Sequence, residues 1–104
     1  MSEILIFCTT DTPESARKIA DDLVEAHAAA CVNIVSGIRS VYRWEGKLCD
    51  EKEILILIKS SAEKFETVRD RIRQLHSYET PEIIAIPITA CDPDYLSWLR
   101  SSLK

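Results

Sequence analysis

Short apolar runs alternate with amphipathic stretches along the chain, and this alternation predicts a mixed fold of strands and helices. Residues 4–8 form a continuous apolar run, which is typical of a strand buried on both faces. Residues 13–29 carry apolar side chains at helical spacing, with charged residues on the opposite face. Asp11 or Thr12 can cap this helix, and Pro13 is tolerated in its first turn. We therefore expect a strand followed by a helix.

The next segment predicts a long hairpin. Residues 31–44 are rich in Val, Ile, Tyr and Trp, and Gly37 interrupts them where a bulge is expected. Beyond Gly37 the pattern alternates, so that Tyr42 and Trp44 share one face. Residues 45–47 are a turn signal, and a second strand is expected over residues 48–60.

The rest of the chain, from residue 60 onward, predicts a helix, a strand and a final helix. Ser60 and Glu63 have the spacing of a capping box, which would open a helix ending near His76. Residues 82–89 form another apolar strand, in which Pro87 requires a bulge or a strand end. Residues 92–93 are expected to cap a short helix that carries Trp98.

The resulting order is β-α-β-β-α-β followed by a terminal helix. This is the α+β ferredoxin-like arrangement. The length of 104 residues predicts a single domain over residues 1–104.

The predicted hairpin favours an oligomer. Each arm is about twice the typical strand length of about 5–6 residues, so the short first and last strands cannot pair with all of it. The excess would project with unpaired edges, which proteins avoid. Pairing with another subunit would cover these edges and bury Tyr42 and Trp44 near the tip.

Composition and charge narrow the classes of partner. The formal net charge is −4 and no basic run occurs, which argues against binding to nucleic acid. The apolar runs are too short to span a membrane, and Glu3 stands where a signal peptide would be positively charged. The four cysteines form no CxxC pair and are expected to be reduced. We expect a soluble, cytoplasmic protein.

Five blocks of the sequence, in order along nearly the whole chain, resemble the CutA divalent-cation tolerance family, including its bacterial members. They are AACVNI (29–34), SVYRWEGK (40–47), EILILIK (53–59), HSYETPEII (76–84) and YLSWL (95–99). The resemblance implies a homotrimer of ferredoxin-like subunits, similar in plan to the PII signalling proteins. It also implies tolerance to copper and other divalent cations through metal binding.

The resemblance places metal ligands at two residues of this chain. In bacterial members the proposed copper ligands are a cysteine ending the first strand and two adjacent histidines after the second helix. Cys8 matches the cysteine and His76 matches the second histidine, whereas the first histidine is replaced by Leu75. Thiolate and imidazole suit copper or zinc better than magnesium or calcium. A buried cysteine and a helix-ending histidine are the structural alternative.

A second group of motif residues is polar or aromatic. It consists of Trp44, Glu53, Tyr78, Glu79 and Trp98. These side chains would line a cleft between subunits that holds a ligand, or would simply form the subunit interface, where aromatic residues are enriched. A cleft of this kind would suit a PII-like signalling or scaffold trimer that binds a metabolite or a protein.

The sequence favours a protein that is not an enzyme. It contains no Ser/His/Asp group, phosphate-binding loop or dinucleotide fingerprint. Cys8 and His76 could form a thiolate–imidazole nucleophile, but no third residue to orient them is evident.

Overall fold

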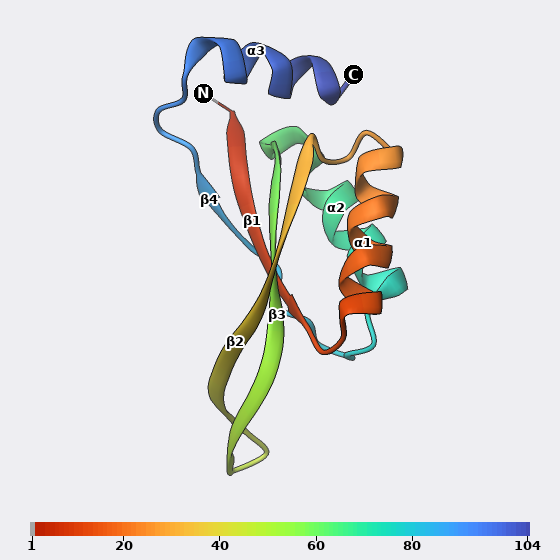
Figure 1. Cartoon of the computed structure of the whole chain (residues 1–104), viewed down its shortest axis with the longest axis vertical. Coiled ribbons are helices and arrows are strands. Elements are labelled where there is room, and N and C mark those ends of the chain that lie inside the picture. Colours follow the sequence, from red (N-terminus) through yellow and green to blue (C-terminus); the bar gives the residue numbers. More distant parts are fainter. Residues whose placement is uncertain (1) are drawn as a thin grey trace.

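Four strands form one antiparallel sheet, with the order β2-β3-β1-β4 across it (Figure 1). The computed structural model describes residues 2–104. The elements are β1 (Glu3–Thr10), α1 (Pro13–Glu25), β2 (Cys31–Trp44), β3 (Lys47–Ser61), a 3-10 turn (Ala62–Lys64), α2 (Phe65–Leu75), β4 (Ile84–Pro87) and α3 (Pro93–Ser102). Their order and pairing confirm the predicted α+β ferredoxin-like arrangement with a C-terminal helix.

Helices α1 and α2 cover one face of the sheet (Figure 1). Alternate side chains of the two central strands point into this layer, because successive strand residues face opposite sides. The fully buried core includes Ile6, Cys8, Ile19, Leu23, Ile56, Ile58, Val68 and Ile72. On the other face Leu5, Phe7, Leu55 and Leu57 are only half-buried within one chain. Strand β1 was expected to be buried on both faces. Within one chain it is fully buried only on the face that the helices cover.

Helix α1 begins as predicted but ends four residues earlier. Thr12 caps it, with its Oγ1 accepting a hydrogen bond from the backbone N–H of Ser15 at 3.1 Å. Its end was expected near residue 29 but lies at Glu25. His27 adopts a left-handed conformation, with φ of 58°, and this reverses the chain. The turn carries Ala28 and Ala29 into the core, which a continuing helix would not allow.

The predicted capping box before α2 is wrong. The Ser60 hydroxyl is buried and donates to the carbonyl oxygen of Ala28 at 2.6 Å, so it ties β3 to the end of the α1 turn. Ser61, which precedes the 3-10 turn, makes no side-chain cap, and α2 starts only at Phe65. A buried hydroxyl needs a partner, and here a long-range carbonyl supplies it in place of the local backbone.

Strand β4 is shorter than the predicted range of residues 82–89, because ladder pairing covers only Ile84 to Pro87. Pro87 is its last residue, as its missing N–H requires.

The β2–β3 hairpin projects beyond the rest of the sheet, as predicted (Figure 1). Strand β3 pairs with β1 from Ile54 to Ser61, whereas from Lys47 to Glu53 it pairs only with β2. A register shift between Val35 and Ile38 confirms the bulge at Gly37, whose φ is 81°. Glu45 and Gly46 both have positive φ, as a type I′ turn requires.

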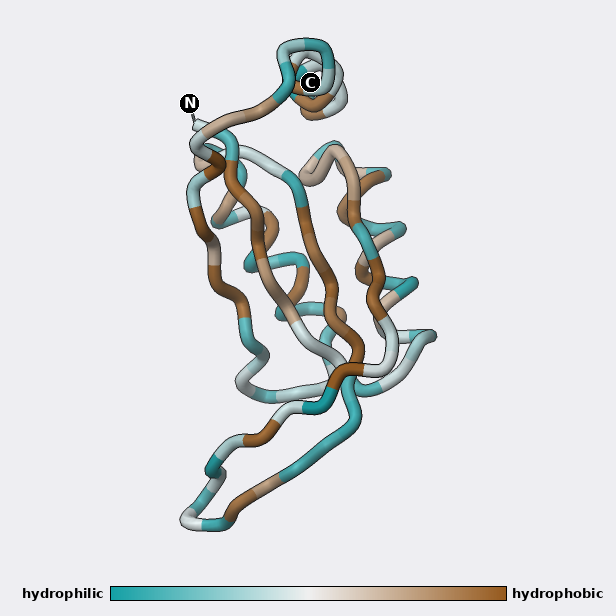
Figure 2. The backbone as a smooth tube through the Cα atoms, turned by 60° about the vertical axis from the view of Figure 1, so that its left-hand side comes forward, coloured by the Kyte–Doolittle hydropathy of each residue, from teal (hydrophilic) through white to brown (hydrophobic). Residues whose placement is uncertain are grey.

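Helix α3 lies across the end of the sheet away from the hairpin tip (Figures 1 and 2). Its Leu99 and Leu103 pack on Ala30. Arg100 donates two hydrogen bonds to the buried Glu3 carboxylate, at 3.1 and 3.2 Å. These bonds hold the pKa of Glu3 below its ordinary value.

The Glu3–Arg100 pair predicts a specific response to acid. A lowered pKa in the folded state means that the stabilisation is present above the ordinary glutamate pKa and is lost as pH falls through the folded value. Wild type should therefore exceed Glu3→Gln in free energy of unfolding at pH 7, and this advantage should shrink at pH 3. Urea unfolding at one protein concentration measures it, with the exposed Glu25→Gln as control. A difference that does not change with pH would contradict the assignment.

Candidate functional site

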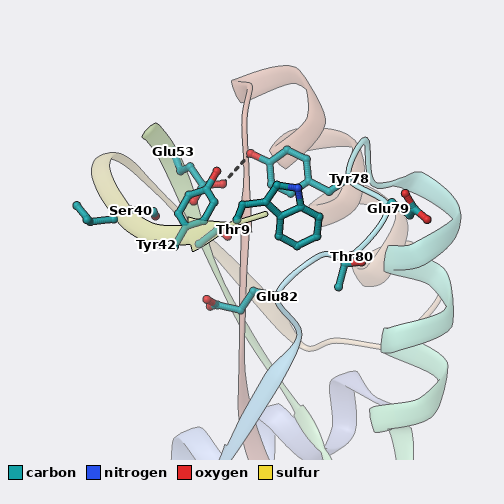
Figure 3. A pocket seen from close by; sticks show the side chains of 10 residues that line it. Thr9, Ser40, Tyr42, Glu53, Tyr78, Glu79, Thr80 and Glu82 are labelled. Carbon is teal, nitrogen blue, oxygen red and sulfur yellow. Dashed lines mark hydrogen bonds between the residues drawn. The ribbon is translucent and has the colours of Figure 1, made fainter. Parts of the chain in front are cut away.

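A cavity of about 610 Å³ opens beside the projecting hairpin (Figure 3). Its walls come from the hairpin, from the end of β1 and from the segment that follows α2. The lining residues are Thr9, Ser40, Val41, Tyr42, Trp44, Glu53, Tyr78, Glu79, Thr80 and Glu82. Segments far apart in the sequence therefore meet here, and the volume is that of a typical small-molecule site.

The hairpin supplies an aromatic wall. Ser40, Tyr42 and Trp44 alternate along β2 and so project from one face of the strand. Glu53 lies on β3 opposite Ile38, just beyond the last residue that pairs with β1. Tyr42 and Trp44 remain about half exposed in the single chain, at 42% and 53%.

The segment after α2 is held in place by His76, the residue that ends the helix. The Nε2–H of His76 donates to the Thr9 carbonyl oxygen at 2.7 Å, and its Nδ1 accepts from the backbone N–H of Tyr78 at 3.0 Å. The rings of His76 and Tyr78 also pack against each other, with centroids 4.7 Å apart. These contacts position Tyr78 over the cavity.

Tyr78 closes the cavity against the hairpin. Its hydroxyl donates to Oε2 of Glu53 at 2.7 Å, a bond that joins the two walls (Figure 3). Glu53 is a charged residue only 7% exposed. Burial and the neighbouring Glu53 carboxylate raise the pKa of Tyr78 well above its ordinary value, so this hydroxyl stays protonated and acts as a donor.

The structure brings the two predicted metal ligands, Cys8 and His76, to one carbonyl oxygen. The thiol of Cys8 donates to the Thr9 carbonyl at 3.7 Å, the same oxygen that accepts from His76. Cys8 is fully buried, and burial, with smaller contributions from Glu82 and Glu53, raises its pKa to about 12. A thiol rather than a thiolate therefore stands at this position near neutral pH, and both nitrogens of His76 are engaged.

Metal binding through Cys8 and His76 stays a prediction, and the geometry defines what it would require. The His76 hydrogen bonds would have to open, and the Cys8 thiol would have to lose its proton to the metal. Within residues 2–104, His, Cys, Asp and Glu side chains do not gather in threes in a way that could hold a metal ion. The pair needs further ligands from outside this arrangement. The four cysteines are free thiols.

Of the five residues predicted to line a cleft, the structure brings four together. Trp44, Glu53, Tyr78 and Glu79 line the cavity. Trp98 lies elsewhere, on α3, where it packs against Tyr95 with ring centroids 5.4 Å apart.

The cleft prediction did not include Tyr42 or Glu82. Tyr42 has the same strand face as Trp44, and this two-residue period could have identified it. Glu82 lies in the motif block of residues 76–84, which is the signal that could have found it, but which residues of that block face the cavity depends on tertiary contacts.

The chain matches the family described as CutA1 divalent ion tolerance protein over residues 4–102. It belongs to this family. The divalent-cation tolerance protein CutA of Thermus thermophilus is 43% identical over 100 residues, covering 96% of this chain and 97% of the relative. The structure of CutA from Xylella fastidiosa superposes with a TM-score of 0.97 at 36% identity and covers all of both chains. The family name therefore supports a role in divalent-cation tolerance.

The names of other relatives refer to different compartments. The chloroplastic protein CutA of Arabidopsis thaliana is 41% identical over 101 residues, covering 97% of this chain and 56% of the relative. A solved structure from Archaeoglobus fulgidus, with a TM-score of 0.95 and 39% identity over 98% of this chain and 99% of that one, is named as a periplasmic CutA. Across residues 2–104, no helix combines the length and apolar character needed to cross a membrane.

The raised pKa of Cys8 predicts selective protection from thiol reagents. Because the thiolate is the reactive form, iodoacetamide at pH 8 should modify the partly exposed Cys31, Cys49 and Cys91 far faster than Cys8. The rate at Cys8 should keep rising with pH while the fold persists, since its pKa lies near 12. Peptide mass spectrometry measures each site, and guanidinium should remove the protection. Equal native rates at Cys8 and Cys49 would contradict the assignment.

Proposed function

We propose that this chain acts as a homotrimer that binds divalent cations, copper among them, without catalysis, and so contributes to divalent-cation tolerance in the cytoplasm. The observation that carries the assembly is the hairpin, whose outer part, Lys47 to Glu53 with its β2 partner residues, pairs with no third strand among residues 2–104. Both outer edges there present free backbone groups, which another subunit can pair with.

The surface chemistry of one chain supports burial in an assembly. The hairpin exposes Val41, Trp44 and Leu48, with Leu48 76% exposed. Ile84 and Ile86 are exposed on β4, the other edge of the sheet. Exposed apolar side chains along two strand edges are typical of surfaces that meet a partner. The number three comes from the resemblance to the family and to the PII plan.

The metal-binding part of the proposal rests on family membership and on the chemistry of Cys8 and His76. A thiol and an imidazole on one carbonyl oxygen suit a soft cation such as copper once the thiol is deprotonated. Leu75 leaves the pair one histidine short, so a carboxylate, a water or a second subunit would complete the site. The high pKa of Cys8 makes this thiol a poor nucleophile, which supports binding without catalysis.

The cavity favours a second candidate function, that of a PII-like signalling or scaffold trimer. A 610 Å³ cavity with aromatic and carboxylate walls has the size and the mixed lining of a small-molecule site. Its occupant would bind beside the hairpin, where subunits of the proposed trimer would meet, so binding could report on the assembly.

Removing the aromatic side chain at the hairpin tip should weaken assembly. Trp44→Ala deletes a large, half-exposed side chain from the surface proposed to meet another subunit. Truncations at such positions can cost about 2 kcal/mol or more. Sedimentation equilibrium over a dilution series should therefore show dissociation at higher concentration than for wild type. Val24→Ala, on the exposed side of α1, is the control. An unchanged trimer in both variants would place Trp44 outside the interface.

The metal proposal predicts that copper binding depends on Cys8. Because free thiols reduce Cu(II), copper is added as Cu(I): anaerobic calorimetric titration into the reduced protein should show saturable binding that Cys8→Ala abolishes. Cys91→Ala removes a partly exposed thiol elsewhere and should leave binding unchanged. Saturable binding that survives Cys8→Ala, or no binding in wild type, would overturn this ligand assignment.

A further inference from the structure

The cavity beside the hairpin carries a concentrated negative charge that forms no ion pair within the described residues 2–104. Glu53, Glu79 and Glu82 line it, and no Lys, Arg or His is among its lining residues. The ion pairs formed within residues 2–104 involve none of these three carboxylates. This contrasts with Glu3, the other buried glutamate, which Arg100 neutralises.

Glu53 is the buried member of the three, and one of its two carboxylate oxygens is a free hydrogen-bond acceptor. Its Oε2 accepts from Tyr78, whereas its Oε1 accepts no hydrogen bond from residues 2–104. Every fully buried side-chain oxygen or nitrogen in these residues has a partner, so Oε1 keeps some accessible surface, and Glu53 is one of the residues that line the cavity. A carboxylate that is 7% exposed and pairs with no cation of residues 2–104 is costly unless a ligand or a neighbouring subunit supplies the charge.

Aromatic rings form much of the remaining wall. Tyr42 and Trp44 come from the hairpin, and Tyr78 comes from the segment after α2. Figure 3 shows Tyr42 and Glu53 on one side of the cavity and Tyr78 and Glu79 on the other, with Glu82 at its edge. Such rings attract cations over their faces and also cover hydrocarbon.

We propose that this cavity binds an aliphatic di- or polyamine. One ammonium group donates a hydrogen bond to Oε1 of Glu53, the methylene chain lies against Tyr42 and Trp44, and a second ammonium group meets Glu79 or Glu82 at the more exposed rim. The inference deepens the second candidate function, binding of a small metabolite, and does not depend on the copper ligands.

The size and the lining distinguish this ligand class from the alternatives. The volume is roughly twenty times that of one water molecule, which is far more than a bare metal ion fills. Three carboxylates would repel an anion. A quaternary ammonium group would satisfy the rings but has no N–H to donate to Oε1. A protonated amine with several charges and a hydrocarbon chain matches the three carboxylates, the free acceptor Oε1 of Glu53 and the aromatic rings.

The test is calorimetric titration of spermidine into the assembled wild-type protein at low ionic strength. We expect saturable binding that Glu53→Gln weakens by about tenfold or more, because a charge-assisted hydrogen bond is lost. Glu25→Gln makes the same change of charge on an exposed residue at the far end of α1 and should leave the affinity unchanged.

Two competitors separate specific binding from general attraction of cations. Mg²⁺ and tetramethylammonium, at matched charge concentration, should displace little spermidine if the methylene chain and the N–H groups are both recognised. Full displacement by Mg²⁺, equal loss in Glu25→Gln, or unchanged binding in Glu53→Gln would overturn the proposal.

Two further measurements cover the cases in which Glu53→Gln does not fold or spermidine does not bind. Should Glu53→Gln fail to fold or assemble, as judged by circular dichroism and sedimentation, Glu82→Gln at the exposed rim takes its place, with at least a severalfold loss of affinity expected. If spermidine does not bind but a neutral or anionic metabolite raises the melting temperature of wild type and not of Tyr42→Ala, the amine class is wrong while the second candidate function stands.

Discussion

The antiparallel pairing of β2 with β3 beyond the end of β1 is the constraint on which the rest of the structure depends. Inside the sheet, β3 has neighbours on both sides; from Lys47 to Glu53 it has only β2. The bulge at Gly37 and the type I′ turn at Glu45 and Gly46 let two long strands stay paired there. That extension creates both the unpaired edges that favour assembly and the aromatic wall of the cavity.

The second wall exists because one histidine uses both ring nitrogens. His76 ends α2 and fixes the following segment to the Thr9 carbonyl and to the backbone of Tyr78. The same contacts place Cys8 and His76 on one oxygen and aim the Tyr78 hydroxyl at Glu53. A metal site at Cys8 and a ligand site at Glu53 would therefore be coupled, because opening the His76 hydrogen bonds for a metal would release the wall that Tyr78 forms.

Local patterns predicted most of the fold and failed where a distant group competes. The Thr12 cap, the bulge at Gly37 and the strand end at Pro87 follow from local chemistry, and the structure confirms them. Ser60 could not be assigned in this way, because its hydroxyl bonds to Ala28, thirty-two residues away, in place of capping the next turn. The early end of α1 likewise reflects the fit of two alanines into the core.

The sequence by itself determined the order of elements, the long hairpin and the family, and its motif blocks contained four of the residues that line the cavity, because periodicity and motif residues are properties of neighbours along the chain. Only the tertiary structure decided the chemistry of the site. It buried Cys8 and so raised its pKa to about 12, engaged both nitrogens of His76, placed Trp98 away from the cavity and left Glu53 without an ion pair within residues 2–104. Desolvation and hydrogen-bond partners arise from packing between distant segments, and no local pattern encodes them.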